Sequence, residues 1–228
     1  MNKKLNFFDY LKRTLILLGL IFMVLVVQIP VQLISLKNFT GIKLFLYIIL
    51  YIVGFGIAIS LATWAYRSVW RQKSHKLTKS DFKLIVIALL TFYVIEIVMQ
   101  LLNGFFFHQI GTKNNAAILD MLKNNPTVLV LMSISMVFLS PILEELVFRG
   151  YLIRGLFFKT NSLIPIIFSG LIFSCGHMSS NIISFMIYAF LGMILAYVYL
   201  KTDKIEVSIG VHFANNLVAT IFMLITIL

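Results

Sequence analysis

Long apolar runs separated by short polar gaps fill most of this 228-residue sequence. Most of the runs extend over about 20 positions, the length that an α-helix needs to cross the hydrocarbon core of a bilayer. None of them alternates apolar and polar residues as the strands of a membrane β-barrel do. The pattern predicts seven apolar segments at roughly 14–36, 42–66, 84–107, 127–147, 162–178, 182–200 and 206–228.

These segments predict an all-α fold, a polytopic transmembrane helical bundle that occupies residues 1–228 as a single integral membrane domain. In lipid no water is present to bond backbone N–H and C=O groups, and helices satisfy these groups within one segment. The fifth segment is short, and we expect it to enter the bilayer without crossing it in a simple way.

The composition agrees with a membrane protein. Hydrophobic residues make up 61% of the chain and charged residues 12%, whereas a soluble domain has about 45–50% apolar and about 25% charged residues. The net charge of +11 could by itself indicate nucleic-acid binding. However, the basic residues lie in the gaps between apolar runs and form no basic face with exposed aromatics, so we expect no nucleic-acid partner.

The basic residues also predict the orientation of the chain, because Lys and Arg concentrate in cytoplasmic loops of membrane proteins. With a cytoplasmic N-terminus, 15 of the 19 Lys and Arg residues fall on the inner side. We therefore expect the N-terminus in the cytoplasm. The short N-terminal tail favours the plasma membrane of a bacterium as the lipid bilayer that holds the protein.

Ionisable residues inside the apolar segments are the first candidates for function, because a charge at the centre of a span costs about 2.5–3.5 kcal/mol on insertion scales. The fourth segment and the residues directly after it contain Glu144, Glu145 and Arg149. Glu145 and Arg149 are four residues apart and share a helix face, whereas Glu144 points about 100° away from Glu145. We expect an ion pair between Glu145 and Arg149, which leaves Glu144 free for chemistry.

Two further segments carry histidines. The fifth ends in Phe173-Ser-Cys-Gly-His177, and the seventh contains His212-Phe-Ala-Asn-Asn216. A single histidine in an apolar run is more often a packing residue, but polar groups on three separate segments are relieved of their insertion cost when they converge around water. Glu96, in the third segment, could line a cavity, pair with a motif residue or be protonated.

Such a set of residues supports hydrolysis in two ways. A carboxylate in a partly desolvated site can act as a general base toward water, while imidazoles and an amide orient the water and stabilise an oxyanion. Alternatively, Glu144, His177 and His212 form a His₂Glu set suited to zinc with an open position for water. The residues leave metal-free and zinc-dependent catalysis equally open.

One feature does not fit seven straight segments. His212 lies about six residues from the inner face, whereas His177 falls near the outer end of its segment. If the fourth and fifth segments form a hairpin that turns near Thr160 and Asn161, Glu144 and His177 lie equally far from that turn. We therefore expect the boundaries of these segments to shift and the helices to meet around a water-filled cavity.

Three short motifs thus occur in a fixed order, each on an apolar segment: Glu144-Glu145-x-x-x-Arg149, Phe173-x-x-x-His177 and His212-x-x-x-Asn216. Together they resemble the motifs of the CPBP intramembrane protease family. That family includes the type II CaaX prenyl endopeptidases and the bacterial Abi proteins associated with bacteriocin processing and self-immunity. The resemblance covers residues 127–225 as a catalytic core, and the joint occurrence of the motifs is specific.

The resemblance implies a role for each motif residue. Glu144 would activate the water, His177 and His212 would contact it or a metal ion, and Asn216 would complete an oxyanion-binding group.

The remaining motif residues, Glu145, Arg149 and Phe173, match positions that we expect to hold the site together. The resemblance therefore implies an intramembrane endopeptidase, and we expect it to cleave a membrane-associated peptide or protein without covalent catalysis. The alternative is a non-enzymatic membrane immunity or scaffold protein that binds a bacteriocin-like peptide or a partner and uses the polar cluster to fix helix packing.

Overall fold

The computed structural model describes residues 6–73, 76–157 and 162–227, and within these ranges all regular secondary structure is helical. The all-α prediction is confirmed. The helices are α1 (Phe7–Val26), α2 (Ile29–Lys37), α3 (Gly41–Val69), α4 (Lys79–Phe107), α5 (Lys113–Asn124), α6 (Pro126–Ile134), the π-helical η1 (Ser135–Leu139), α7 (Ser140–Glu145), the π-helical η2 (Leu146–Tyr151), α8 (Leu152–Leu156), α9 (Leu163–Cys175), α10 (Ile182–Thr202) and α11 (Ile205–Ile227).

Six stretches of the described chain are long and apolar enough to cross a membrane. They are Phe7–Lys37, Gly41–Val69, Lys79–Phe107, Pro126–Leu156, Ile182–Thr202 and Ile205–Ile227. The predicted seven segments correspond to these six and to α9, an apolar helix of 13 residues. Helix α9 is the fifth segment, which the sequence marks as short.

The observed helices differ from the predicted segments most of all in the fourth segment and in the stretch before it. The fourth segment continues past its predicted end at residue 147 to Leu156, because Arg149 is buried among neighbouring helices and need not mark the edge of the membrane. Helix α5 occupies a stretch that was expected to be an outer loop. Thr112 begins this helix by accepting a hydrogen bond from the backbone N–H of Asn115 (3.2 Å), and Leu122 on its inner face is buried.

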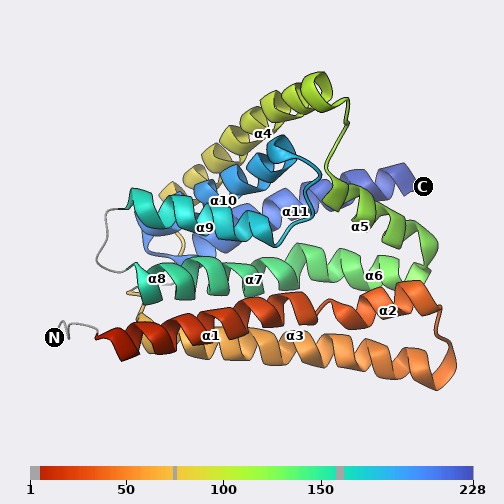
Figure 1. Cartoon of the computed structure of the whole chain (residues 1–228), viewed down its shortest axis with the longest axis horizontal. Coiled ribbons are helices and arrows are strands. Elements are labelled where there is room, and N and C mark those ends of the chain that lie inside the picture. The colour runs from red at the N-terminus through yellow and green to blue at the C-terminus, as the bar shows by residue number, and fades with distance from the viewer. Residues whose placement is uncertain (1–5, 74–75, 158–161, 228) are drawn as a thin grey trace.

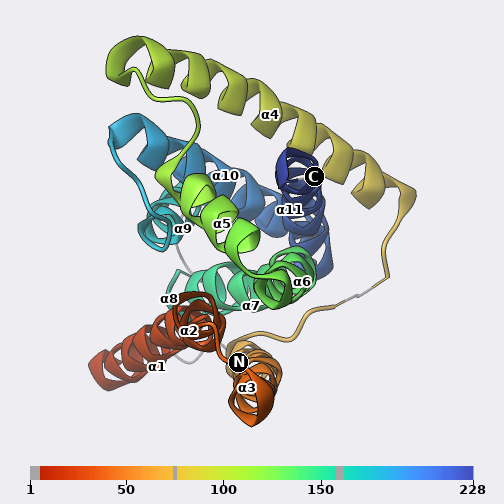
Figure 2. The same cartoon turned by 90° about the vertical axis from the view of Figure 1, so that its right-hand side faces the viewer.

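The helices surround the stretch α6–α8, which carries the first motif. Figure 1 shows α1, α2 and α3 along one side of this stretch and α9, α10 and α11 along the other. Helix α4 crosses the outer side of α10 and α11, and α5 lies between α4 and α6 in the view of Figure 2. The start of α1 and the end of α11 lie at opposite ends of the bundle (Figure 1).

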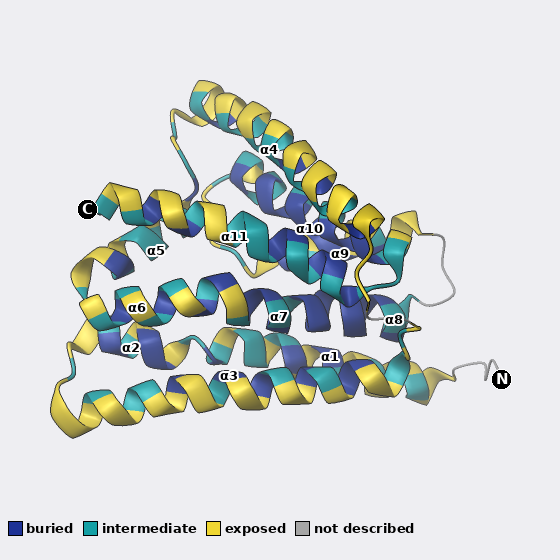
Figure 3. Cartoon of the chain, turned by 180° about the vertical axis from the view of Figure 1, so that it is seen from behind, coloured by how far each residue is buried: buried dark blue, intermediate teal, exposed yellow. Residues whose placement is uncertain are grey.

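Burial follows the pattern of a membrane protein, with a largely apolar outer surface and polar groups inside. Exposed residues run along α3 and α4, whereas α7 and α10 are mostly buried (Figure 3). The exposed side chains include large apolar ones such as Leu50, Trp64, Leu90 and Phe105. A continuous apolar surface of this extent suits contact with lipid.

Charged residues form a network at the end of the bundle where α1 begins. Arg154 donates a hydrogen bond to Asp203 (2.5 Å), and its guanidinium carbon lies 4.1 Å from the ring centroid of Trp70. Lys204 donates to Asp81 (2.6 Å), which joins the start of α4 to the turn between α10 and α11. These residues belong to connections that the distribution of Lys and Arg predicts on the inner side of the membrane. In the structure these connections lie close together.

Helices α9 and α10 approach so closely that their backbones are in contact. A Cβ atom added to Gly170 would lie 2.6 Å from the carbonyl oxygen of Ala189, and one added to Gly192 would lie 2.8 Å from the Cα atom of Gly170. Both distances are too short for a real side chain, so glycine is required. Small residues permit this kind of contact between membrane helices, and here the contact holds α9 beside the first motif.

Candidate active site

The helix that carries the first motif contains two π-helical segments, one on each side of α7. A π segment has a wider turn than an α-helix and frequently occurs at functional sites. In η1 the carbonyl oxygen of Met136 accepts a hydrogen bond from Asn216 Nδ2 (2.8 Å). In η2 the carbonyl oxygen of Phe148 accepts one from Ser169 Oγ (3.0 Å). The two π segments therefore bind α11 and α9 through their backbone.

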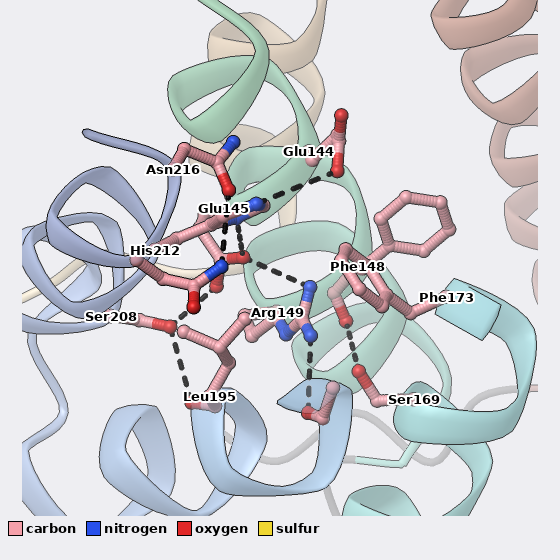
Figure 4. A network of polar contacts seen from close by, with 12 residues as sticks. Glu144, Glu145, Phe148, Arg149, Ser169, Phe173, Leu195, Ser208, His212 and Asn216 are labelled. Carbon is pink, nitrogen blue, oxygen red and sulfur yellow. Dashed lines mark hydrogen bonds and ion pairs between the residues drawn. The ribbon is translucent and has the colours of Figure 1, made fainter. Parts of the chain in front are cut away.

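Glu145 is the centre of a buried polar network (Figure 4). Its Oε1 atom accepts hydrogen bonds from Arg149 Nη1 (2.9 Å) and His212 Nδ1 (2.9 Å). Its Oε2 atom accepts a hydrogen bond from Ser208 Oγ. The side chains of Glu145 and Arg149 are both 0% exposed. The ion pair predicted from the spacing of these two residues is confirmed.

The guanidinium of Arg149 also contacts the helices on the other side. Its Nη2 atom donates to the carbonyl oxygen of Gly192 in α10 (3.0 Å). Its central carbon lies 4.5 Å from the ring centroid of Phe173 in α9, which is a cation–π contact. Arg149 thus joins the first motif to α9 and α10, and Phe173 is buried between them.

His212 lies between the two adjacent carboxylates. Because Nδ1 donates its hydrogen to Glu145, the neutral ring carries its lone pair on Nε2. This Nε2 atom lies 3.9 Å from Oε2 of Glu144, whose side chain is 15% exposed. The described residues give the Glu144 carboxylate no hydrogen bond, whereas three donors bind Glu145. The two carboxylates therefore differ in their surroundings, as the helical geometry predicts.

His177 follows the end of α9. Its Nδ1 atom donates to the carbonyl oxygen of Phe173 (3.0 Å), so its lone pair also lies on Nε2. The imidazole stacks on the ring of Tyr188, with centroids 4.3 Å apart and an angle of 18° between the planes. Tyr188 in turn shares a hydrogen bond with Thr112 (2.7 Å). Burial lowers the pKa of His177 to about 4, so the ring is neutral at neutral pH.

The motif side chains meet at a cavity of about 1050 Å³. Its wall includes Glu144, Phe173, His177, His212 and Asn216. Asn216 uses one N–H of its side-chain amide for Met136, and the amide has a second N–H to offer to a ligand.

The predicted meeting of the fourth and fifth segments is also observed. Glu144 lies 12 residues before the end of α8, and His177 lies 14 residues after the start of α9, so both reach the same cavity. The predicted turn near Thr160 and Asn161 lies outside the described residues. Glu96 lines the cavity as well, which was the first of the alternatives open for it.

Three residues of this region were not identified from the sequence: Ser169, Tyr188 and Ser208. Ser208 lies four residues before His212 and therefore on the same helix face, a spacing that could have identified it. Ser169 and Tyr188 contact residues far away in the chain. Single hydroxyl groups in apolar helices carry no comparable signal.

Glu144, His177 and His212 are chemically suited to zinc, but they do not form a metal site in this arrangement. Among residues 6–73, 76–157 and 162–227, no group of three or more His, Cys, Asp or Glu side chains is placed to hold a metal ion. The hydrogen-bond donors around Glu145 satisfy that carboxylate without a cation.

The part of the chain that carries these residues is similar to known proteins. Residues 126–218 match the model of the family described as type II CAAX prenyl endopeptidase Rce1-like. This range contains every residue of the three motifs.

A protein of Bacillus subtilis (strain 168) named "Putative membrane peptidase YdiL" is 31% identical to this chain over 113 residues. The aligned part covers 50% of this chain and 44% of that protein, so the match spans less than half of the relative. No solved structure gives a significant match. The chain is an integral membrane protein, and its resemblance to the CPBP intramembrane proteases is confirmed over the region that carries the three motifs.

Proposed function

We propose that this protein is an intramembrane endopeptidase that hydrolyses a peptide bond of a membrane-associated peptide or protein. The observation that carries the proposal is the difference between two adjacent carboxylates. Glu145 is buried and bound by three donors, whereas Glu144 faces the cavity, 3.9 Å from the Nε2 atom of His212. A carboxylate free of hydrogen-bond donors in a partly enclosed cavity can remove a proton from water.

In the proposed reaction Glu144 takes a proton from a water molecule as the water oxygen attacks the carbonyl carbon of the substrate. The second hydrogen of this water is accepted by the Nε2 atom of His177 or of His212, since each ring holds its Nδ1 hydrogen in a bond to the protein and has its lone pair on Nε2. The second N–H of the Asn216 amide donates to the oxygen that becomes negative in the tetrahedral intermediate.

The intermediate then collapses with cleavage of the C–N bond. Glu144 returns the proton to the leaving nitrogen, so the products are one carboxyl group and one amine. Glu145 takes no proton in this scheme. It fixes the ring of His212 in the required tautomer and balances the charge of Arg149.

The proposal is tested with the purified protein in lipid nanodiscs and a library of fluorogenic apolar peptides. We expect Glu144→Gln, His177→Ala and His212→Ala each to lower cleavage by a factor of about 10² or more, the contribution of a general base or of a preorganised donor. Asp120→Asn removes a carboxylate from an exposed position outside the cavity and serves as the matched control.

Full turnover in all three variants would contradict the proposal. All variants must accumulate in the membrane fraction at the level of the control, because loss of the protein would also remove activity. A chain that cleaves no peptide but still binds them, with binding unchanged in Glu144→Gln, fits instead the non-enzymatic binding protein.

A further inference from the structure

Glu96 lies in the middle of α4, outside the three motifs, and lines the same cavity as the proposed catalytic residues. The reaction scheme gives it no part. Glu96 and Glu144 are the two carboxylates among the described residues of the cavity wall, and none of these residues is Lys or Arg. The whole chain has 19 Lys and Arg residues against 8 Asp and Glu. The cavity is therefore acidic within a strongly basic protein.

The Glu96 carboxylate forms no hydrogen bond or ion pair with the residues that the structure describes. Tyr93 lies one helical turn before it on the same cavity wall, and its buried hydroxyl group also lacks a hydrogen-bond partner in this part of the chain. An ionisable group inside a membrane span is costly to insert and is usually retained for a function. The two side chains together offer a carboxylate and a hydroxyl to a ligand.

Glu96 is also close to the proposed catalytic site. Its carboxylate interacts electrostatically with the hydroxyl groups of Tyr93 and Tyr188. The ring of Tyr188 stacks on His177, with 4.3 Å between the centroids. Glu96, Tyr188 and His177 thus all line one cavity, and Tyr188 is within electrostatic range of Glu96 and in contact with His177. Aromatic rings beside a carboxylate attract ammonium and guanidinium groups, because the face of the ring carries negative charge.

We propose that Glu96 forms a subsite that binds a cationic group of the substrate, either a Lys or Arg side chain or a free amino terminus. Such a cation meets no competing basic residue in the described wall and balances a carboxylate that the protein leaves without a partner. The remaining wall is mostly apolar, with residues such as Ile21, Met132 and Leu191. The preferred substrate is therefore an apolar peptide with a positive group near the bond that is cleaved. This inference rests on the proposed function and specifies its substrate.

The test compares fluorogenic apolar peptides that differ at one position only. One set is N-acetylated and carries Lys, Gln or Glu at each position in turn, and a second set has a free amino terminus and no Lys. With the wild-type protein in nanodiscs we expect a KM for the best Lys or free-amine peptide roughly tenfold or more below that of its neutral counterpart, the effect of one charge-assisted hydrogen bond. The two sets distinguish a side chain from a terminal amine.

Glu96→Gln should bring this KM ratio close to one, and Glu96→Lys should reverse it in favour of the Glu peptide. Asp120→Asn removes the same charge from an exposed site and should keep the wild-type ratio. A ratio of two peptides measured on one protein sample does not depend on the fraction of folded protein. Binding of the same labelled peptides to the Glu144→Gln protein, followed by fluorescence anisotropy, gives a second measure that needs no cleavage.

The outcomes separate the two proposals. In one outcome the protein cleaves the peptides with no preference for a cation, or with a preference that Glu96→Gln leaves unchanged. Either result contradicts the subsite but not the proposed endopeptidase activity. Absence of cleavage together with cation-dependent binding that disappears in Glu96→Gln supports the subsite and overturns the endopeptidase.

Discussion

Breaking the buried pair between Glu145 and Arg149 should destabilise the protein strongly. Both side chains are 0% exposed, and Arg149 has one carboxylate partner at 2.9 Å. Removal of one member of a buried ion pair leaves the other charge without compensation, which costs about 3–5 kcal/mol. We therefore expect Glu145→Gln and Arg149→Met each to lower the free energy of unfolding by this amount.

The double variant Glu145→Gln/Arg149→Met should lose much less than the sum of the two single losses, because it leaves no unpaired charge. We expect a coupling energy of about 2 kcal/mol or more. The measurement is the free energy of unfolding in mixed micelles, obtained by titration with a denaturing detergent for the wild type, both single variants and the double variant.

Activity provides an independent readout of the same cycle. The double variant should regain stability but remain a poor enzyme, because a neutral amide at position 145 no longer holds the Nδ1 hydrogen of His212 with a charge. The reasoning is refuted if the stability losses of the two single variants sum to the loss of the double variant within about 0.5 kcal/mol. The two side chains would then not depend on each other.

Three further predictions concern other parts of the site. Gly192→Leu should abolish the accumulation of the protein in membranes, which immunoblots measure. Even a Cβ atom at this position would lie 2.8 Å from the Cα atom of Gly170, and overpacking a core costs about 1–3 kcal/mol or more. Tyr188→Phe keeps the stack on His177 and loses the hydrogen bond to Thr112, so it should reduce kcat only a few-fold. Tyr188→Leu also loses the contact between the rings, which should raise the activation free energy by about another 0.5–1.5 kcal/mol. Burial holds the pKa of His177 at about 4, below the ordinary 6.5, so the unfolded chain takes up a proton on this ring between pH 6.5 and 4 while the folded chain does not. The free energy of unfolding should therefore fall as the pH falls through this window, and thermal melts of His177→Gln should lack that part of the decrease.

Metal removal gives one more measurable outcome. Because no three donor side chains in the described part of the chain are placed to hold a metal ion, we expect cleavage by the purified protein to continue after dialysis against a chelator. Metal analysis of the same sample accompanies the assay. Loss of activity that returns with added zinc would show that Glu144, His177 and His212 rearrange to bind the ion.

The sequence predicted those features that depend on spacing within one helix. The helical period predicts that Glu145 pairs with Arg149 and that Glu144 points away from this pair. The apolar runs predict where the membrane spans lie. The expectation that Glu144 and His177 lie at one depth came from their similar distance to a turn. Each of these inferences needs only local geometry and the requirement that polar groups in lipid find partners.

Other features could not be predicted because they arise from contacts between distant segments. The stack of His177 on Tyr188 depends on how α9 and α10 approach at Gly170 and Gly192. Helix α5 was missed because its 12 residues are too polar for a membrane segment. The π segments have no signature in the apolar pattern, since they differ from an α-helix by a single residue per turn.

The π segments let the helix from α6 to α8 hold more residues than a regular α-helix of the same length. Each one accommodates an additional residue in a turn, so deleting Val147 from η2 would let the helix return to regular α geometry while the residues after it keep their rotation about the axis. Arg154 would still reach Asp203 at the charged end of the bundle. The carbonyl oxygen of Phe148, which now accepts a hydrogen bond from Ser169, would return to the hydrogen bonds within the helix. A shorter helix would therefore keep its charged end in place and loosen its contact with α9.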